Sequence, residues 1–418
     1  MRPFQSTITL DEARRRIAAA IQSIDRTETV PLENAHGRVL AAAIVAPIDN
    51  PPFDRSAMDG YAVRSLDTST ASRTSPAVLR CVGRAYTAEP FSGSLAPGEC
   101  VEIATGAPVP ESADAIVMVE DTARPGSGDW PAPAWLDSAE SVLVLSPALP
   151  GQHVVRRGAD VRAGETVVEA GTPLDASRVG AIAAVGFDRV TVFARPRVAI
   201  FPTGNEVVPP GRPLPIASVY DINSYTVAAL VERHGGEPRR FPSVRDTIAD
   251  VREALDRAAD ADVIVLAGGS SVGERDVIVD AVAERGEVIF HGIAVKPGKP
   301  TLFARIPRAA GVQLVFGMPG NPTSCLSNVH VLLVPALRAL AHLPPHEPVR
   351  LRRTLASAVS SPRNRHQFLP VRLEVTQAVP TFKGSGEITS LSSADGYVEI
   401  PIGVDRLEAG EEVEVTIY

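Results

Sequence analysis

Three short glycine-containing loops carry the residues best suited to binding an anion. They are TGNE (203–206), GGSSVG (268–273) and MPGNP (318–322), and each follows a run that predicts a buried parallel strand. Glycine lets backbone amides approach an anion closely, and a helix beginning after Asn321 adds a favourable dipole. Ligands bind at the carboxyl ends of strands in open α/β sheets. Together the loops predict a phosphate or oxyanion site, although each alone could be a turn that merely needs positive φ.

Two lysines and two aspartates extend this predicted site. Lys296 and Lys299 flank the Pro-Gly turn of KPGKP (296–300), so both can converge on one anion as point charges. A solvated hairpin tip is the alternative. Asp246 and Asp276 each begin a predicted helix, where an N-cap role alone would explain them. Beside an oxyanion, such carboxylates can also hold a divalent cation such as Mg²⁺.

Polar residues in three other motifs are more simply explained as turn residues than as site residues. Asp59 lies in SAMDGYA, where the following glycine would supply the turn conformation, and Thr105 lies in ATGAPVP. Asp160 in RRGADVRAGE is expected to pair with Arg156 or Arg157. From residue types alone, these positions predict loops.

Composition and missing motifs exclude several classes of protein. The net charge of -8 argues against a broad nucleic-acid surface, so the positive site for an anion must be local. The three cysteines lie far apart, which fits a reducing cytoplasm. The amino terminus does not resemble a secretory signal, and no stretch approaches the roughly 20 apolar residues of a membrane span. HExxH, GxSxG, Walker and GxGxxG motifs are absent.

Hydrophobic periodicity predicts a multi-domain protein with a doubly wound α/β domain and β-rich domains. A capping box at Thr9 and Glu12 opens a helix that runs to about residue 24. Strands are expected at 198–201, 263–266, 288–290 and 314–316, with helices at 223–234, 246–257, 276–286 and from 321, where Pro335 should kink or end the helix. Short β segments at 78–82, 100–103 and 115–119 predict a β-rich middle domain, and 30–46 is expected to pair with 150–178. The period-two tail predicts a small β-barrel or sandwich.

The motifs, taken in order, resemble the molybdopterin molybdenumtransferase family, which includes the gephyrin E domain. They are PPFDRSAMDGYAV, TGAPVPESADAIV, RRGADVRAGE, PRVAIFPTGNEVV, GGSSVGERD, KPGKP and MPGNP, and the match spans about residues 5–418. The resemblance implies an elongated homodimer with four domains per chain. The expected domains are a molybdopterin- and nucleotide-binding α/β domain (1–26 and 179–338), a small β linker domain (27–46 and 150–178), a β-rich domain carrying SAMDGYA (47–149) and a carboxyl-terminal β-barrel (346–418).

This resemblance also implies an activity and a set of site residues. Family members bind adenylylated molybdopterin and molybdate, insert the metal into the dithiolene and release AMP, in a cleft between the α/β domain and parts of the partner subunit. Matching motifs assign catalytic roles to Asp59, Asp160, Asp246 and Asp276, the last two also as ligands of Mg²⁺ or another divalent cation. They assign ligand binding to Thr105, Glu206, Gly268, Gly269, Ser271, Gly273, Lys296, Lys299, Pro319, Gly320, Asn321, Pro322, Arg365 and Ser385.

Two positions depart from the family pattern. The family usually has Asp at the position of Asn205 and Val at the position of Ser270, so local contacts and metal preference can differ. We expect a cytoplasmic homodimer that contacts the adenylyltransferase and molybdoenzymes transiently and binds neither nucleic acid nor membrane. The resemblance does not decide between molybdate and tungstate, or which carboxylate has which role.

Two other functions compete with this interpretation. A molybdopterin adenylyltransferase uses a similar α/β domain, but the additional β domains and SAMDGYA argue against it. A non-catalytic scaffold is known in the gephyrin branch, but no long linker or fused second domain is visible here. Activity that survives Asp59→Ala and Asp276→Ala would favour the scaffold.

Overall fold

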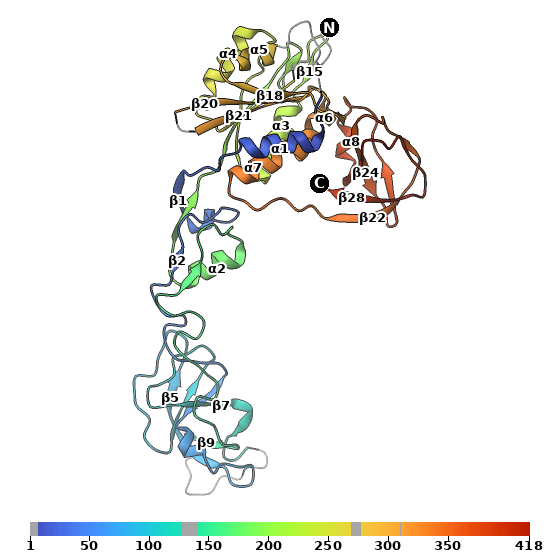
Figure 1. Ribbon diagram of the computed structural model, residues 1–418. Coiled ribbons are helices and arrows are strands. Elements are labelled where there is room, and N and C mark those ends of the chain that lie inside the picture. Colours follow the sequence, from blue (N-terminus) through green and yellow to red (C-terminus); the bar gives the residue numbers. More distant parts are fainter. Residues whose placement is uncertain (1–6, 128–129, 131–139, 269–276, 310) are drawn as a thin grey trace. The chain divides into compact units, whose positions relative to one another are not determined.

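The computed structural model describes residues 7–127, 130, 140–268, 277–309 and 311–418 (Figure 1). The chain divides into two compact units, which are described separately below. The first contains residues 1–29, 37–41 and 191–418, and the second contains 30–36 and 42–190. This division is coarser than the four predicted domains, whose boundaries stay a prediction.

The first unit contains a six-stranded sheet with helices on both faces (Figure 1). In spatial order its strands are β16 (Glu237–Arg240), β13 (Arg197–Pro202), β17 (Val263–Ala267), β21 (Gly311–Met318), β20 (Leu302–Arg308) and β18 (Glu287–His291). The first four are mutually parallel, as expected for the strands that precede the glycine loops, whereas β20 is antiparallel to both of its neighbours. Strand β20 was not predicted.

Side chains that alternate along the central strands divide the apolar core between the two faces of this sheet. Val198 and Ile200 pack with helices α1 (Leu10–Ala20), α3 (Asn223–Arg233) and α7 (Val334–Leu340). Ala199 and Phe201 pack with α4 (Ile248–Arg257) and α5 (Val277–Ala283) on the other face. The doubly wound α/β prediction is therefore confirmed. The Thr9 hydroxyl caps α1 by accepting from the Glu12 amide at 3.2 Å, but α1 ends at Ala20, earlier than predicted.

The helix that follows MPGNP continues through Pro335 without ending. It consists of α6 (Pro322–Asn328), a π-helical turn η4 (Val329–Leu333) and α7. Proline lacks the N–H that a regular helical turn would use, and the wider turn before it accommodates that loss. The helix Pro322–Leu340, with 19 residues, is long and apolar enough to span a membrane by length and composition alone. The sequence-based expectation that no stretch approaches this length is therefore wrong. In the 18-residue apolar window of this helix, 72% is buried inside the fold, as in a core helix.

A closed β-barrel completes the first unit, as the alternating tail predicts. Its strands follow the ring β24 (His366–Leu373), β25 (Gln377–Pro380), β22 (Arg350–Leu355), β28 (Glu412–Ile417) and β26 (Gly396–Ile400), and β26 pairs again with β24. Their inward-facing apolar side chains form one core. The short strand β19 (Val295–Lys296) pairs in parallel with β24 and joins KPGKP to the barrel. The remaining elements are β23 (Val359–Ser360), β27 (Arg406–Leu407) and helix α8 (Thr389–Ser392).

The second unit is rich in β structure, as predicted. Its main sheet has the order β7 (Ala115–Met118), β4 (Gly60–Val63), β6 (Glu99–Ile103), β5 (Ala77–Ala85), β9 (Ser141–Val144) and β8 (Thr122–Ala123). Strand β2 (Ile44–Val45) pairs with β11 (Thr166–Val168), which confirms the expected pairing of 30–46 with 150–178. The unit also contains β3 (Arg55–Ser56), β10 (Val154–Val155) and α2 (Ala176–Ala184), and the unit boundaries fall within β1 (Thr27–Pro31) and β12 (Arg189–Phe193).

A histidine cluster in the first unit predicts loss of stability in acid. His234 is 3% exposed, and its ring lies 5.1 Å from that of His346, while the His330 ring lies 4.9 Å from that of Tyr418. Burial lowers the pKa of both His234 and His330 to about 4, and neighbouring histidine charge (His346 for His234, His234 for His330) lowers it further. Arg233 and Arg338 also face the cluster and oppose protonation.

Because the unfolded chain binds these protons first, the folded chain loses stability as the pH falls from about 6.5 toward 4. We expect the free energy of unfolding to fall by about 1.4 kcal/mol per pH unit for each histidine in that range. Urea unfolding at pH 7, 5.5 and 4.5 measures this. The double substitution His234→Asn and His330→Asn should flatten the profile; an unchanged slope would assign the acid sensitivity to other groups.

Candidate active site

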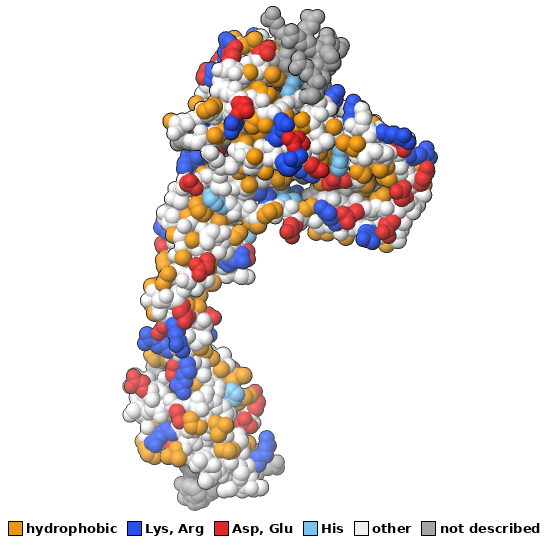
Figure 2. All heavy atoms as spheres, in the orientation of Figure 1, with side chains coloured by type: hydrophobic (Ala, Val, Ile, Leu, Met, Phe, Trp, Pro, Cys, Tyr) orange, Lys and Arg blue, Asp and Glu red, His pale blue; other side chains and the backbone are white. Residues whose placement is uncertain are grey.

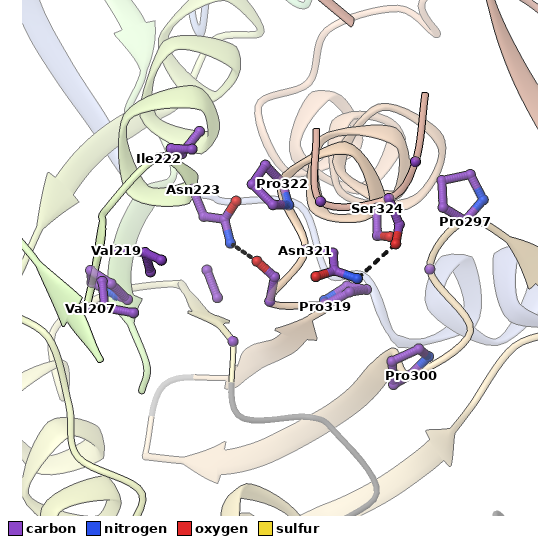
Figure 3. A pocket seen from close by; sticks show the side chains of 18 of the residues that line it. Val207, Val219, Ile222, Asn223, Pro297, Pro300, Pro319, Asn321, Pro322 and Ser324 are labelled. Atoms are coloured by element: carbon purple, nitrogen blue, oxygen red, sulfur yellow. Dashed lines mark hydrogen bonds between the residues drawn. The ribbon is translucent and has the colours of Figure 1, made fainter. Parts of the chain in front are cut away.

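A cavity of about 830 Å³ lies at the carboxyl ends of β13, β17 and β21, within the first unit (Figure 3). The predicted oxyanion crevice is therefore a real hollow. Many of the residues predicted for ligand binding line it, namely Glu206, Gly268, Lys296, Lys299, Pro319, Gly320, Asn321, Pro322, Arg365 and Ser385. Four further predicted residues, Gly269, Ser271, Gly273 and Asp276, lie outside the described residues, as does Ser270.

The first two glycine loops meet at Thr203. Gly268 has φ +126°, and a Cβ there would overlap the Thr203 carbonyl oxygen. Gly204 has φ +134°, and a Cβ there would lie 2.7 Å from a Glu206 carboxylate oxygen, because this side chain folds back over the loop. Both glycines are thus favoured by their positive φ, and Gly268 is also required by its contact with the backbone, whereas the Glu206 side chain beside Gly204 can move. Asn205 is exposed and does not line the cavity.

The fully buried side chain of Asn328 fixes the conformation of the KPGKP loop. The Asn328 Nδ2 donates to the Gly298 carbonyl at 2.8 Å and to the Thr301 Oγ1 at 2.7 Å, and the Thr301 hydroxyl donates to the same carbonyl at 2.9 Å. Gly298 has φ +104°, and a Cβ there would overlap the Asn328 amide group. Both lysines line the cavity, so the alternative of a solvated hairpin tip is wrong.

The MPGNP loop is tied to both sides of the cavity. Asn223, at the start of α3, donates from Nδ2 to the Gly320 carbonyl at 2.9 Å (Figure 3). Asn321 is the N-cap residue of α6, as predicted, but its side chain does not cap the helix. It donates from Nδ2 to Ser385 Oγ at 2.8 Å, on the loop after β25. The barrel thereby contributes Ser385 to the cavity wall.

Asp246 lies beside Glu206. A parallel bridge between Thr203 and Val244 places the segment before α4 against the TGNE loop. Burial of the carboxyl group raises the pKa of Asp246, and the Glu206 carboxylate raises it further. The N-cap of α4 is Thr247, whose hydroxyl accepts from the Asp250 amide at 3.1 Å, so the predicted capping role of Asp246 is wrong.

Three predicted residues belong to the second unit, so the cavity of the first does not bring them together with the others. Asp59 and Thr105 are neighbours there, because an Asp59 carboxylate oxygen accepts from the Thr105 amide at 2.7 Å. Gly60 was expected to supply a turn conformation, but it lies in β4, where a Cβ would overlap the Val117 carbonyl oxygen.

Asp160 does not have its predicted arginine partners. Its carboxylate accepts from Asn50 Nδ2 at 2.9 Å, whereas Arg156 pairs with Asp54 and Arg157 with Asp49. The two arginines are thus engaged by acidic residues from an earlier part of the chain, which local sequence could not indicate.

Comparisons with known proteins agree over nearly the whole chain. Residues 8–186 match the MoeA N-terminal region (domain I and II), 199–339 a probable molybdopterin binding domain, and 352–418 the MoeA C-terminal region (domain IV). The chain is 36% identical to molybdopterin molybdenumtransferase 2 of Mycobacterium tuberculosis over 97% of this chain and 98% of that protein. This chain belongs to the molybdopterin molybdenumtransferase family. A Nostoc sp. member is 31% identical over 94% of this chain and 89% of its own length. The crystal structure of a molybdopterin biosynthesis MoeA protein from Pyrococcus horikosii has a TM-score of 0.81 and 39% identity, covering 99% of each chain.

Lysine is rare in this chain, and most of its lysines lie at the cavity. Of 41 Lys and Arg residues only three are lysines, namely Lys296, Lys299 and Lys383. Two line the cavity, and the third lies on the loop that carries Ser385. On the face shown in Figure 2, basic and acidic side chains are intermixed. A compact ammonium group suits a site where several donors converge on one anion, and Arg365 adds a guanidinium group to the two lysines there.

Sequence reasoning missed several lining residues, among them Tyr220, Asp221, Asn223 and Phe382. Asp221 accepts from the Ser224 amide at 3.0 Å and so caps the start of α3. The asparagine at the start of this predicted helix was a usable signal, since helix starts that follow strands line the same crevice. Phe382 had no such signal, because it reaches the cavity from the barrel.

The raised pKa of Asp246 predicts a gain in stability when its charge is removed. A carboxyl group with a raised folded-state pKa stabilises the fold below its unfolded pKa and loses that contribution as the pH rises through the folded value. Asp246→Asn should therefore raise the free energy of unfolding at pH 7 by at most about 1 kcal/mol, and not below pH 4.

Urea unfolding in the presence of EDTA measures this difference. Asp256→Asn is the control, and it should lower the free energy of unfolding at pH 7, because the hydrogen bond from Arg285 lowers the pKa of Asp256. A stability gain for Asp246→Asn that persists in acid would contradict an electrostatic origin.

Proposed function

We propose that this chain inserts molybdate-derived molybdenum into adenylylated molybdopterin and releases AMP. One observation carries the proposal: Lys296, Lys299, Arg365 and the glycine loops converge on one cavity in an otherwise acidic chain. A phosphoanhydride and an oxometalate dianion both need donors and positive charge during the reaction. The cavity supplies them from the α/β domain and the barrel together.

Each group has a role that follows from its chemistry. Lys296, Lys299 and Arg365 would offset the charge of phosphate and oxyanion. The backbone amides of Gly320 and Asn321 would donate to phosphate oxygens, as a glycine turn permits. Asp59, Thr105 and Asp160 remain proposed contributors from the second unit.

A divalent cation fits the carboxylates of Glu206, which lines the cavity, and Asp246, which interacts with Glu206 but is not a lining residue. Glu206 raises the pKa of Asp246, and a cation between them would remove that repulsion. Among the described residues no group of three or more His, Cys, Asp or Glu side chains could hold a metal ion. Mg²⁺ commonly uses only one or two carboxylates together with ligand phosphates, so this does not conflict. Asp246 and Glu206 would hold the ion, with Asp276 as the further proposed ligand, and Mg²⁺ would supply positive charge beside the phosphates.

Incubation with adenylylated molybdopterin tests the reaction directly. The transferase should release AMP only when molybdate is present, whereas an adenylyltransferase or a scaffold would not depend on molybdate. AMP is measured by chromatography with and without Mg²⁺. Molybdate-independent release, or none under any condition, would contradict the proposal.

Amine acylation provides an independent test of the site. Molybdate and AMP together should protect Lys296 and Lys299 from acetylation, while Lys383 reacts at an unchanged rate. Mass spectrometry resolves these positions. Equal reactivity of all three lysines with and without ligand would place the anion elsewhere.

Oligomeric state, location and partners belong to the same proposal. A cytoplasmic homodimer with transient contact to the adenylyltransferase and to molybdoenzymes is consistent with an enzyme that passes on a labile product. Light scattering of the purified chain tests the dimer.

A further inference from the structure

Asn321 lines the cavity, and its side chain bonds the hydroxyl of Ser385, which also lines it. Its amide nitrogen donates to Ser385 Oγ at 2.8 Å, and the Ser385 carbonyl accepts from the Thr323 amide at 3.2 Å. In Figure 3 a dashed line marks the hydrogen bond that the Asn321 amide nitrogen donates. Ser385 is therefore fixed through both its backbone and its side chain.

A serine hydroxyl has one proton to donate and two lone pairs to accept with. In the structure Asn321 occupies a lone pair of Ser385 Oγ, so the hydroxyl proton must point elsewhere. No carbonyl or carboxylate within the described ranges accepts this proton, and Ser385 lines the cavity with Lys296, Lys299 and Arg365. Lysine and arginine only donate. The cationic side chains of the cavity thus only donate, whereas its lining carboxylates, Glu206 and Asp221, come from the TGNE loop and from the segment before α3.

We infer that Asn321 is a positioning residue that keeps the Ser385 hydroxyl as a donor toward the oxyanion, and that this arrangement favours fully ionised oxyanions over hydrogenphosphate. The inference rests on the proposed function, because it names how the same site selects its oxyanion. Molybdate, tungstate and sulfate carry no proton at neutral pH. Hydrogenphosphate carries one, which needs an acceptor, and the ammonium and guanidinium groups of Lys296, Lys299 and Arg365 offer it none.

Sulfate and phosphate are the probes of choice because they have nearly the same size. Calorimetry at pH 7.5 should show that the wild-type chain binds molybdate, and competition should show sulfate preferred over phosphate by about 10-fold or more. Asn321→Ala should weaken molybdate binding by about 5- to 30-fold and reduce the preference for sulfate. Asn321→Asp should shift the ratio further toward phosphate, since its carboxylate accepts the Ser385 proton and turns the oxygen lone pairs to the ligand.

A double-mutant cycle separates positioning from a structural role. If Asn321 acts through Ser385, then Asn321→Ala changes molybdate affinity by less than about 2-fold in a Ser385→Ala background. Thr323→Val is the matched control, because it removes a 2.9 Å bond from the same helix start to the Glu387 carbonyl without touching the Ser385 hydroxyl. It should leave molybdate affinity within about 2-fold of wild type.

Several outcomes would overturn the inference. They are an undiminished effect of Asn321→Ala without Ser385, an equal loss in Thr323→Val, or a wild-type chain that binds no molybdate or does not discriminate sulfate from phosphate. The wild-type ratio decides the matter even if the Asn321 variants do not fold. Molybdate bound with normal selectivity but without AMP release would instead refute the proposed function and leave this inference intact.

Discussion

Substitution of Lys296 or Lys299 by Gln should lower the rate of molybdate-dependent AMP release by about 10²- to 10³-fold each. Removing one preorganised donor from a site that stabilises developing negative charge typically has this effect. Both side chains line the cavity on one loop, which Asn328 holds at Gly298. Steady-state AMP release at saturating ligand measures the change, and unchanged unfolding curves would assign it to the site.

Lys383→Gln is the matched control for this prediction. Lys383 is exposed, its Nζ donates to Thr389 Oγ1 at 3.2 Å, and it does not line the cavity, although its loop carries Ser385. The same chemical change there should leave AMP release within about 2-fold, as expected for a surface charge. Similar losses in all three variants would mean that net charge, rather than position in the cavity, governs the rate.

Gly268→Ala should destabilise the first unit by about 2–5 kcal/mol. Two penalties combine, since a φ of +126° is strained for any other residue and the new methyl group would overlap the Thr203 carbonyl oxygen. The oxygen belongs to the backbone at the end of β13, so it cannot turn aside as a flexible side chain would. Urea unfolding of the chain without ligand measures the loss.

Gly320→Ala provides the comparison within the same cavity. Its added Cβ would meet only the Gly268 Cα, at an ordinary 3.5 Å, and its φ is not in the strained range. We expect a change in unfolding free energy of less than about 0.5 kcal/mol. Equal destabilisation by both substitutions would show that any methyl group at this wall is costly and that the Thr203 contact is not special.

Local patterns in the sequence predicted most of what lies near the strand ends. The buried runs of β13, β17 and β21 and the glycines that follow them are properties of neighbouring residues, because strand formation and positive φ depend on short stretches. The rule that ligands bind at the carboxyl ends of parallel strands then located the cavity. The period-two tail likewise predicted the barrel.

Local patterns misled where a residue's partner is distant in the chain. Asp246 looked like a helix cap, but Thr247 has that role and Asp246 lies beside Glu206. Asp160 bonds Asn50 and not its near neighbours. Spacing along the chain does not report which loops the sheet brings side by side, so no local signal could have corrected these assignments.

The cysteines illustrate the same limit. Cys81 and Cys100 are far apart in the chain, yet β5 and β6 pair them in register, and the hydrogen bond with Cys100 lowers the pKa of Cys81 to about 6. β5 and β6 are consecutive strands but pair in parallel, so no tight hairpin turn joins them and fixes their register, and the local sequence does not specify it.

Residue types and short-range order alone determined the strands, the glycine turns, the two lysines available for an anion and the family to which the chain belongs. Tertiary packing alone decided that Asn328 holds the lysine loop, that Glu206 opposes Asp246, and that Asn321 directs the Ser385 hydroxyl. The reason is physical: backbone conformation is governed by neighbours in the chain, whereas hydrogen-bond partners and pKa values are governed by neighbours in space.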